Sequence, residues 1–226
     1  MKKLLLLFTF CAAAFSASAQ DGPIGVRSST DYGFGSSDSR NNGFGIKAGF
    51  NLADLRGQDK GAYQDLESLK SYHAGVYAQF ALNEKFSIQP EFLFSRKGFN
   101  AQAFDLVTGQ PAGSKEETRL DYLQVPVLLV YNIVDNVSLH VGPQVSLLVN
   151  AKYAGRERSI SDVGLNSLEY GVVGGVEARV GPARLGARYD LGLADIYNDP
   201  QDAGADAYDN VKNGVFQVYL GIGISN

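Results

Sequence analysis

The chain has no tryptophan, one cysteine and two histidines among its 226 residues. The cysteine, Cys11, lies in an apolar stretch that we expect to be removed, so the mature protein is predicted to contain no thiol. This absence excludes disulfides, thiolate metal sites and cysteine nucleophiles. Two histidines are also too few for most metal centres and acid–base pairs.

Positive charge and long apolar runs are also scarce. The chain carries 20 Lys and Arg against 24 Asp and Glu, a formal net charge of −4. Loss of Lys2 and Lys3 leaves 18 basic against 24 acidic residues, which is −6. Nucleic acid is therefore not an expected partner. Beyond the N-terminus no stretch approaches the roughly 18 consecutive apolar residues of a transmembrane helix.

The N-terminus predicts export. Lys2 and Lys3 precede an apolar stretch from Leu4 to Phe15, and Ala17, Ser18 and Ala19 form a small-residue cleavage site. This order is typical of a secretory signal peptide, residues 1–19. Residues 20–42 are rich in Gly, Ser, Asp and Asn and predict a flexible periplasmic segment. Residues 43–226 remain as one domain.

From about residue 43 onward, eight runs alternate apolar and polar residues. In the first run Phe44, Ile46 and Phe50 share one phase, whereas Lys47 and Asn51 share the other. The fourth run is apolar in both phases at its far end, so we choose as lipid-facing the phase that sends Gln124 inward, and a slip of one residue would reverse it. The lipid-facing phase of the fifth run is Val137, Leu139, Val141, Val145, Leu147 and Val149.

The connections between these runs alternate long and short. Short ones are expected at 83–85, 132–136 and 181–182, and long ones at roughly 53–71, 99–118, 151–167 and 195–214. An even strand number puts both termini and the short turns on the periplasmic side and the long loops outside. The sequence therefore predicts an all-β fold: an eight-stranded antiparallel transmembrane β-barrel, an up-and-down meander in which closure satisfies the backbone. Aromatic girdles are expected at its two rims, with the candidates Tyr72, Phe94, Tyr131 and Tyr170.

The inward phase combines many glycines with charges of both signs. A barrel of eight strands is just wide enough for side chains to fill. We therefore expect a paired ionic network in the lumen, favoured over an ion or proton path because an unpaired buried charge costs several kcal/mol. The predicted network residues are Lys47, Glu91, Glu169, Glu177, Arg179, Arg184, Arg188 and Asp190.

Catalytic and metal sites are weakly indicated. The topology puts His73 near the outer rim, with Asp54, Asp59 and Ser71 as possible company, and His140 low on an ascending strand. A rim hydrolase built on His73 is a minor alternative. The last loop could gather Ca²⁺ ligands but lacks EF-hand spacing, so a solvated acidic loop is favoured. Its carboxylates are Asp195, Asp199, Asp202, Asp206 and Asp209. We predict no enzyme activity, no cofactor and no metal.

Four segments resemble a known family. They are FSIQPEFLFSRKG (86–98), DYLQVPVLLVY (121–131), VGPQVSLLVNAK (141–152) and LGARYDLGLADI (185–196). Together they resemble the porin-family or PorT-like outer-membrane β-barrel proteins of Bacteroidota. Gln124 stands where that family often has glutamate, and Asn226 ends the chain where many barrels end in an aromatic residue. The resemblance implies an outer-membrane location and an eight-stranded fold, and it leaves the function open.

Three functions are compatible with this barrel. The first is a non-enzymatic protein with a filled lumen, whose outer loops serve envelope integrity, adhesion or partner binding. The second is a low-conductance channel or an accessory component of a protein secretion system. Its partners, besides membrane lipid, would be envelope or secretion proteins. The third is a soluble lipocalin-like ligand-binding barrel, disfavoured because glycines on a solvated face would weaken the strands.

Overall fold

The computed structural model describes residues 43–57, 64–104, 111–158, 165–196 and 211–224. The expected signal peptide and periplasmic segment, residues 1–42, lie outside the described residues. Nine strands are present in the described part of the chain. They are β1 (Gly43–Arg56), β2 (Gln64–Ala81), β3 (Phe86–Phe104), β4 (Pro111–Val134), β5 (Val137–Tyr153), β6 (Arg156–Arg158), β7 (Leu168–Val180), β8 (Ala183–Gly192) and β9 (Lys212–Ile224). The described residues contain no helix long and apolar enough to cross a membrane.

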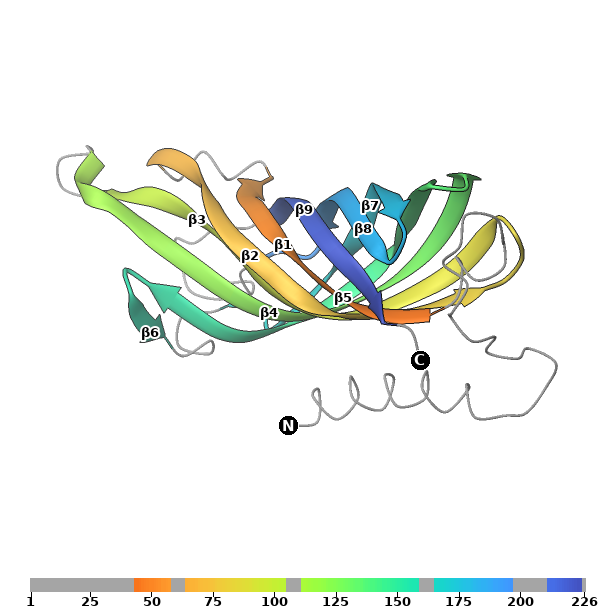
Figure 1. The fold of residues 1–226 in the computed structure, drawn as a ribbon. Coiled ribbons are helices and arrows are strands. Elements are labelled where there is room, and N and C mark those ends of the chain that lie inside the picture. The colour runs from red at the N-terminus through yellow and green to blue at the C-terminus, as the bar shows by residue number, and fades with distance from the viewer. Residues whose placement is uncertain (1–42, 58–63, 105–110, 159–164, 197–210, 225–226) are drawn as a thin grey trace.

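Eight of these strands form a closed antiparallel ring. Consecutive strands pair from β1 to β5, β5 pairs with β7, and β7, β8 and β9 follow in order. The ring closes between β9 and β1, where pairing runs from Phe44 opposite Ile224 to Arg56 opposite Lys212. Figure 1 shows these two strands side by side although they are the first and last of the chain. The predicted eight-stranded up-and-down barrel is confirmed, with β6 as a short addition beside the end of β5.

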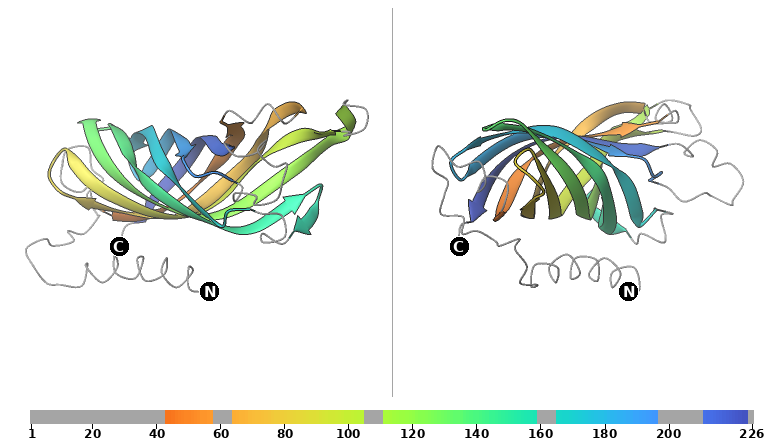
Figure 2. Two further views of the ribbon diagram at one scale, coloured as in Figure 1. Left: turned by 180° about the vertical axis from the view of Figure 1, so that it is seen from behind. Right: turned by 90° about the vertical axis from the view of Figure 1, so that its right-hand side faces the viewer.

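Closure satisfies the backbone without any free edge in the membrane. The strands are steeply tilted, as two further views show (Figure 2). The short turns lie at 82–85, 135–136 and 181–182, as predicted except that β4 continues through residues 132–134 of the second one. In the first of these, Asn83 Oδ1 accepts hydrogen bonds from the backbone NH groups of Lys85 and Phe86, both at 2.9 Å. Following the rule for such barrels, we call this end periplasmic and the opposite end outer.

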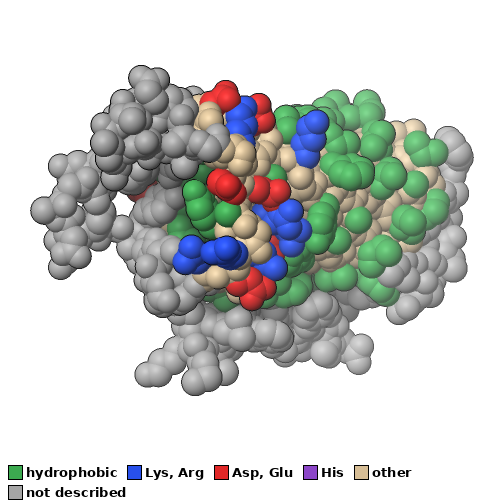
Figure 3. Space-filling view, turned by 90° about the vertical axis from the view of Figure 1, so that its left-hand side faces the viewer, with side chains coloured by type: hydrophobic (Ala, Val, Ile, Leu, Met, Phe, Trp, Pro, Cys, Tyr) green, Lys and Arg blue, Asp and Glu red, His purple; other side chains and the backbone are tan. Residues whose placement is uncertain are grey.

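The alternation of side chains is largely as the sequence predicts. Phe44, Ile46 and Phe50 are 44%, 49% and 80% exposed, whereas Lys47 and Asn51 are each 3% exposed. The phase chosen for the fourth run is also observed, because Gln124 is buried at 1% and Leu129 is 44% exposed. Apolar side chains therefore cover the outer wall of the barrel, as Figure 3 shows over the half of the molecule that is mostly green.

The fifth run keeps its predicted phase up to a bulge near its outer end. Leu147 is only 8% exposed, but it lies opposite the outward residues Leu123 and Leu168, whereas Leu148 is 3% exposed and belongs to the inner face. The register with β4 changes here, from Tyr122 opposite Leu148 to Asp121 opposite Asn150, so Val149 is an extra residue on β5. Such a bulge interrupts the alternation, which a period of two cannot anticipate.

The long outer connections are shorter than expected. β1 continues to Arg56, β2 starts at Gln64, β3 reaches Phe104 and β4 starts at Pro111, so most of 53–71 and 99–118 is strand rather than loop. The third connection contains β6. Strand pairing continues because the inner face of these ends is apolar and buried, with Leu55, Leu69 and Leu120 between 1% and 6% exposed.

Aromatic pairs lie near both rims of the apolar wall. Tyr72 and Phe94 lie 6.0 Å apart between ring centroids, and Phe86 and Tyr131 lie 5.0 Å apart. Phe86 and Phe94 are on the same strand, and at about 3.3 Å a residue with a tilt of about 40° their levels differ by about 20 Å. This spacing suits the apolar band of an outer-membrane barrel.

The close packing of strands around inward glycines gives a test of closure. A Cβ added to Gly175 on β7 would lie 2.4 Å from the carbonyl oxygen of Ala187, whereas one added to Gly221 on β9 would have no neighbour closer than 3.5 Å. We expect Gly175→Ala to destabilise the barrel by about 1–3 kcal/mol through overpacking. Gly221→Ala should leave stability unchanged. The measurement is the temperature at which the folded band of each variant is lost in SDS electrophoresis, and equal behaviour of the two would contradict this packing.

Candidate functional site

The lumen holds all eight residues that were predicted to form its ionic network. Each is at most 7% exposed, and they come from four strands. They fall into three groups along the barrel. We call these the lower cluster (Glu177, Arg179, Arg184), the central cluster (Lys47, Glu91, Arg188) and the upper cluster (Glu169 and Asp190, with Lys97 between them). The upper cluster is nearest the outer end, because Lys97 lies outward of Glu91 on β3 and Glu169 lies outward of Glu177 on β7.

The central cluster is one carboxylate shared by two cations. Lys47 Nζ lies 2.6 Å from Glu91 Oε1, and an Arg188 guanidinium nitrogen lies 2.7 Å from Glu91 Oε2. Gln89 donates a further hydrogen bond of 2.6 Å to Oε1. The second cation is held from its other side, because Arg188 Nε donates to Gln217 Oε1 at 2.6 Å. Each oxygen of this buried carboxylate therefore has a charged donor.

A tyrosine ring supports the excess positive charge of this cluster. Lys47 Nζ lies 4.2 Å from the centroid of the Tyr219 ring, and the Arg188 guanidinium lies 5.5 Å from it. The face of an aromatic ring attracts cations, more strongly where water is excluded. The Tyr219 hydroxyl in turn donates to Glu177 Oε2 at 2.9 Å, which links the central cluster to the lower one.

In the lower cluster the same arrangement recurs. Glu177 Oε1 accepts from Arg179 and Arg184, both at 3.2 Å. Arg184 also donates to Gln79 at 2.7 Å, and Arg179 donates to the Ser138 hydroxyl at 3.2 Å. The side chains of four strands are tied together at this level. A second shared carboxylate therefore fills the periplasmic part of the lumen.

In the upper cluster the ratio of charges is inverted. Lys97 Nζ lies 2.5 Å from Glu169 and 2.9 Å from Asp190, so one cation serves two carboxylates. The remaining oxygen of Glu169 accepts from Asn213 at 2.5 Å. Asp190 accepts from Gln124 at 3.0 Å and from Gln144. Every charge in this group is compensated by a partner within hydrogen-bonding distance.

Lys97 was not among the predicted residues. The alternation of the third run is followed only to Ser95 and the predicted loop starts at residue 99, so Lys97 belongs to neither prediction. The available signal was the phase itself, because Glu91, Ser95 and Lys97 are all odd-numbered positions on β3 and all buried. The polar neutral partners, such as Gln217 and Tyr219, carried no signal in sequence because their role depends on which strand faces them across the lumen.

Both histidines face the lumen: His73 follows Tyr72 of the outer aromatic pair on β2, and His140 lies near the periplasmic start of β5. His73 Nδ1 lies 2.6 Å from Asn51 Oδ1, and its ring meets that of Tyr219 edge-on at 6.2 Å. His140 is 4% exposed. The Nε2 atoms of both have no hydrogen-bond partner among the described residues. Asp54, expected beside His73, is exposed on the outer face instead, and Asp59 lies outside the described residues.

An apolar core closes the lumen above the upper cluster. Its lowest member is Tyr122, whose ring lies 5.1 Å from Lys97 Nζ and whose hydroxyl accepts from Asn213 at 3.3 Å. We call this group the outer core. Its members are Leu55, Phe99, Ala101, Leu120, Tyr122, Leu148, Ala151, Leu165, Ile196 and Val211. Since most of these are inward positions of the outer strand ends, the inside of the barrel changes there from polar to apolar.

The outward face changes in the opposite sense at the same level. Beyond Tyr72 and Phe94, it carries Lys70 and Arg96, and Arg96 forms two hydrogen bonds with Asp121 at 2.7 and 3.1 Å. Further out, Lys115 lies 2.7 Å from Asp65 and 2.5 Å from Glu67, and these hydrogen bonds raise the pKa of its ammonium. Figure 3 shows Lys, Arg, Asp and Glu side chains gathered at one end of the molecule, beside the apolar wall. The outer part is therefore built as a water-facing barrel.

The acidic last loop is described only in part. Asp195 Oδ1 lies 3.3 Å from Lys212 Nζ, whereas Asp199, Asp202, Asp206 and Asp209 lie outside the described residues. Within the described ranges no three His, Cys, Asp or Glu side chains group as a metal site would require.

A family model described as "Outer membrane protein beta-barrel domain" matches residues 20–198. The chain belongs to this family. Because the family consists of outer-membrane barrels, this protein resides in the outer membrane and contacts its lipid. The soluble lipocalin-like alternative does not fit a member of this family. No curated protein sequence matches the chain.

Several solved structures of outer-membrane proteins are similar to this barrel. A major outer membrane protein from Thermus thermophilus is 15% identical with a TM-score of 0.49, covering 81% of this chain and 99% of that one. Neisserial surface protein A is 16% identical with a TM-score of 0.47, covering 80% and 97%. The attachment invasion locus protein Ail of Yersinia pestis is 18% identical with a TM-score of 0.43, covering 80% and 98%.

The central cluster yields a test of the lumen. Glu91→Gln removes the carboxylate that Lys47 and Arg188 share and leaves two buried cations uncompensated. We expect the free energy of unfolding to fall by about 3–5 kcal/mol, measured by urea titration of the barrel in lipid vesicles. The control is Glu157→Gln, whose side chain is also ion-paired, with Lys152 at 3.0 Å, but is 72% exposed. It should have almost no effect, because exposed ion pairs contribute little. If the Glu91→Gln barrel is as stable as this control, the charges in the lumen are not held by the ion pairs described here.

Proposed function

We propose that this protein is a non-enzymatic, sealed outer-membrane barrel that acts through its outer part in envelope integrity, adhesion or partner binding. The observation that carries this proposal is the continuous filling of the lumen. Three clusters of paired charges occupy it from Arg179 at the periplasmic end to Lys97, and the outer core lies directly above them. A barrel filled in this way anchors and displays its outer strands rather than passing solutes.

Two features support the outer part as the acting surface. β3 and β4 extend far beyond the apolar band, to Phe104 and from Pro111, and their outer core gives them a stable base. The short strand β6 adds a further charged edge, since Arg156, Glu157 and Arg158 are all exposed. Rigid strands ending in charged, exposed side chains suit the recognition of another macromolecule.

The second candidate is an accessory role in protein secretion, with a PorT-like protein of Bacteroidota as the model. The segments 86–98 and 121–131 support it through their resemblance to that group. In this case the periplasmic segment 20–42, released by cleavage of a signal peptide at residues 1–19, would contact envelope components. A low-conductance channel is the remaining alternative. The clusters of paired charges that fill the lumen disfavour it.

Conductance distinguishes the sealed barrel from the channel. In planar bilayers the wild-type protein, verified as folded by its heat-dependent shift in SDS electrophoresis, should give no single-channel steps. The triple variant Lys47→Ala, Glu91→Ala and Arg188→Ala removes the central cluster without leaving an unpaired charge. It should also give no steps, because the lower cluster, the upper cluster and the outer core still fill the lumen. Regular steps from the wild-type protein would support the channel and reject the seal.

Photo-crosslinking in intact cells distinguishes outer display from a periplasmic accessory role. A photoreactive residue at Glu157 on β6 probes the outer end, and one at Asn136 in the turn after β4 probes the periplasmic end. We expect protein adducts at position 157 and none at position 136. Adducts confined to position 136 would support the secretion role and overturn the outer-surface proposal.

A further inference from the structure

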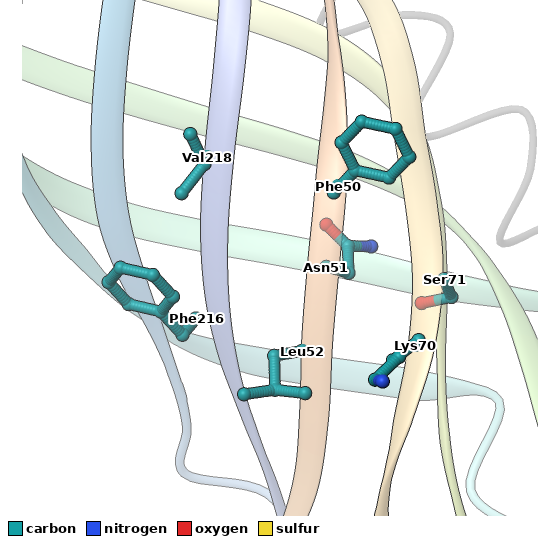
Figure 4. Close-up of a pocket in the computed structure, with 7 residues that line it drawn as sticks. All are labelled: Phe50, Asn51, Leu52, Lys70, Ser71, Phe216 and Val218. Carbon is teal, nitrogen blue, oxygen red and sulfur yellow. The ribbon is translucent and has the colours of Figure 1, made fainter.

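A groove indents the outer wall of the barrel near its outer rim. It has a volume of about 290 Å³ and is lined by residues of β1, β2 and β9. Figure 4 shows Phe216 and Val218 on one side, Phe50 and Leu52 on the middle strand, and Lys70 on the other side. Its floor includes Asn51 and Ser71, whose side chains are buried.

The register of three strands builds this groove. Leu52 lies opposite Phe216 on β9 and opposite Lys70 on β2, and Phe50 lies opposite Val218. All four apolar side chains face outward, and Phe50 is 80% exposed. Toward the membrane centre the next outward pair is Ala48 opposite Ala74, which are both small. The wall beside Phe50 is therefore recessed in the direction that an acyl chain would take.

The groove ends where the outward face changes from apolar to charged. Lys70 lies at this boundary. On β1, its partner Leu52 is the last apolar outward residue, and the next outward residue is Asp54. An extended acyl chain lying in the groove would thus have its headgroup at the level of the Lys70 ammonium. The exposed Asp54 accepts a hydrogen bond from the NH of Leu55.

Lys70 differs from Arg96, Arg119 and Lys115, the cations of β3 and β4 near the outer rim. Arg96 is bound to Asp121, Arg119 to Glu117 and Lys115 to Asp65 and Glu67. Among the described residues, no carboxylate oxygen lies within 4.0 Å of Lys70 Nζ. An ammonium at the headgroup level attracts anionic lipid with about 1 kcal/mol. Lys70 is thus available to a phosphate that approaches from the membrane.

We infer that this groove is a binding site for one anionic, phosphate-bearing lipid of the surrounding outer leaflet. The acyl chain lies along Phe50, Leu52, Phe216 and Val218, and the headgroup phosphate accepts hydrogen bonds from the Lys70 ammonium. The site goes beyond the proposed role of the outer strands, because it faces the membrane and does not depend on a protein partner or on the state of the lumen.

The absence of tryptophan allows a direct test. Phe216→Trp places a single fluorophore in the groove, and Tyr170→Trp places one on β7, 56% exposed in the wild type and also near the outer end of the wall. Each full-length variant is reconstituted in phosphatidylcholine vesicles containing a minor fraction of phosphatidylglycerol, with bromine on the acyl chains of one lipid or the other. Brominated chains quench tryptophan on contact.

We expect brominated phosphatidylglycerol to quench Trp at position 216 about fivefold more per mole than brominated phosphatidylcholine does, which corresponds to about 1 kcal/mol. At position 170 the two lipids should quench equally. Adding Lys70→Gln to Phe216→Trp should abolish the preference without loss of the folded band. Equal quenching at position 216, or a preference that survives Lys70→Gln, would overturn the inference. Weak quenching at 216 by both lipids would also overturn it, since a second copy of the chain would then cover the groove.

Discussion

The closure of the sheet between β9 and β1 is the constraint on which the rest of this structure depends. It removes every free strand edge from the membrane, and in doing so it encloses a lumen too narrow for bulk water. Whatever side chains point inward must then satisfy one another. The sharing of Glu91 between Lys47 and Arg188, and of Lys97 between Glu169 and Asp190, follows from this enclosure.

The level near Tyr72 and Phe94 divides the molecule into two kinds of barrel. Below it, apolar side chains face lipid and charges face inward. Above it, Arg96 and Lys115 face outward, while Leu55, Phe99 and Leu120 pack inside. The outward face of the same strands thus contacts lipid in the lower part and water in the upper part. The backbone hydrogen bonds are the same in both parts, because strand pairing does not depend on which face of the sheet is apolar.

The fold and most of the lumen charges could be predicted from the sequence because a period of two is a local property. Strand phases were readable wherever one face was uniformly apolar, as around Phe44 to Leu52. The bulge at Val149 and the outer strand ends were missed, because the first interrupts the period and the second inverts its polarity. Pairings such as that of Lys97 with Asp190, and the groove between β9, β1 and β2, depend on strands distant in sequence.

The unequal strand lengths make one side of the barrel taller than the other. β4 has 24 residues and β8 has 10, so at the usual rise and tilt their heights are about 60 Å and about 25 Å. One side of the wall stands far above the bilayer, and the opposite side ends close to its surface. A neighbour that approaches along the membrane therefore meets a tall protein face from one side and a low rim from the other.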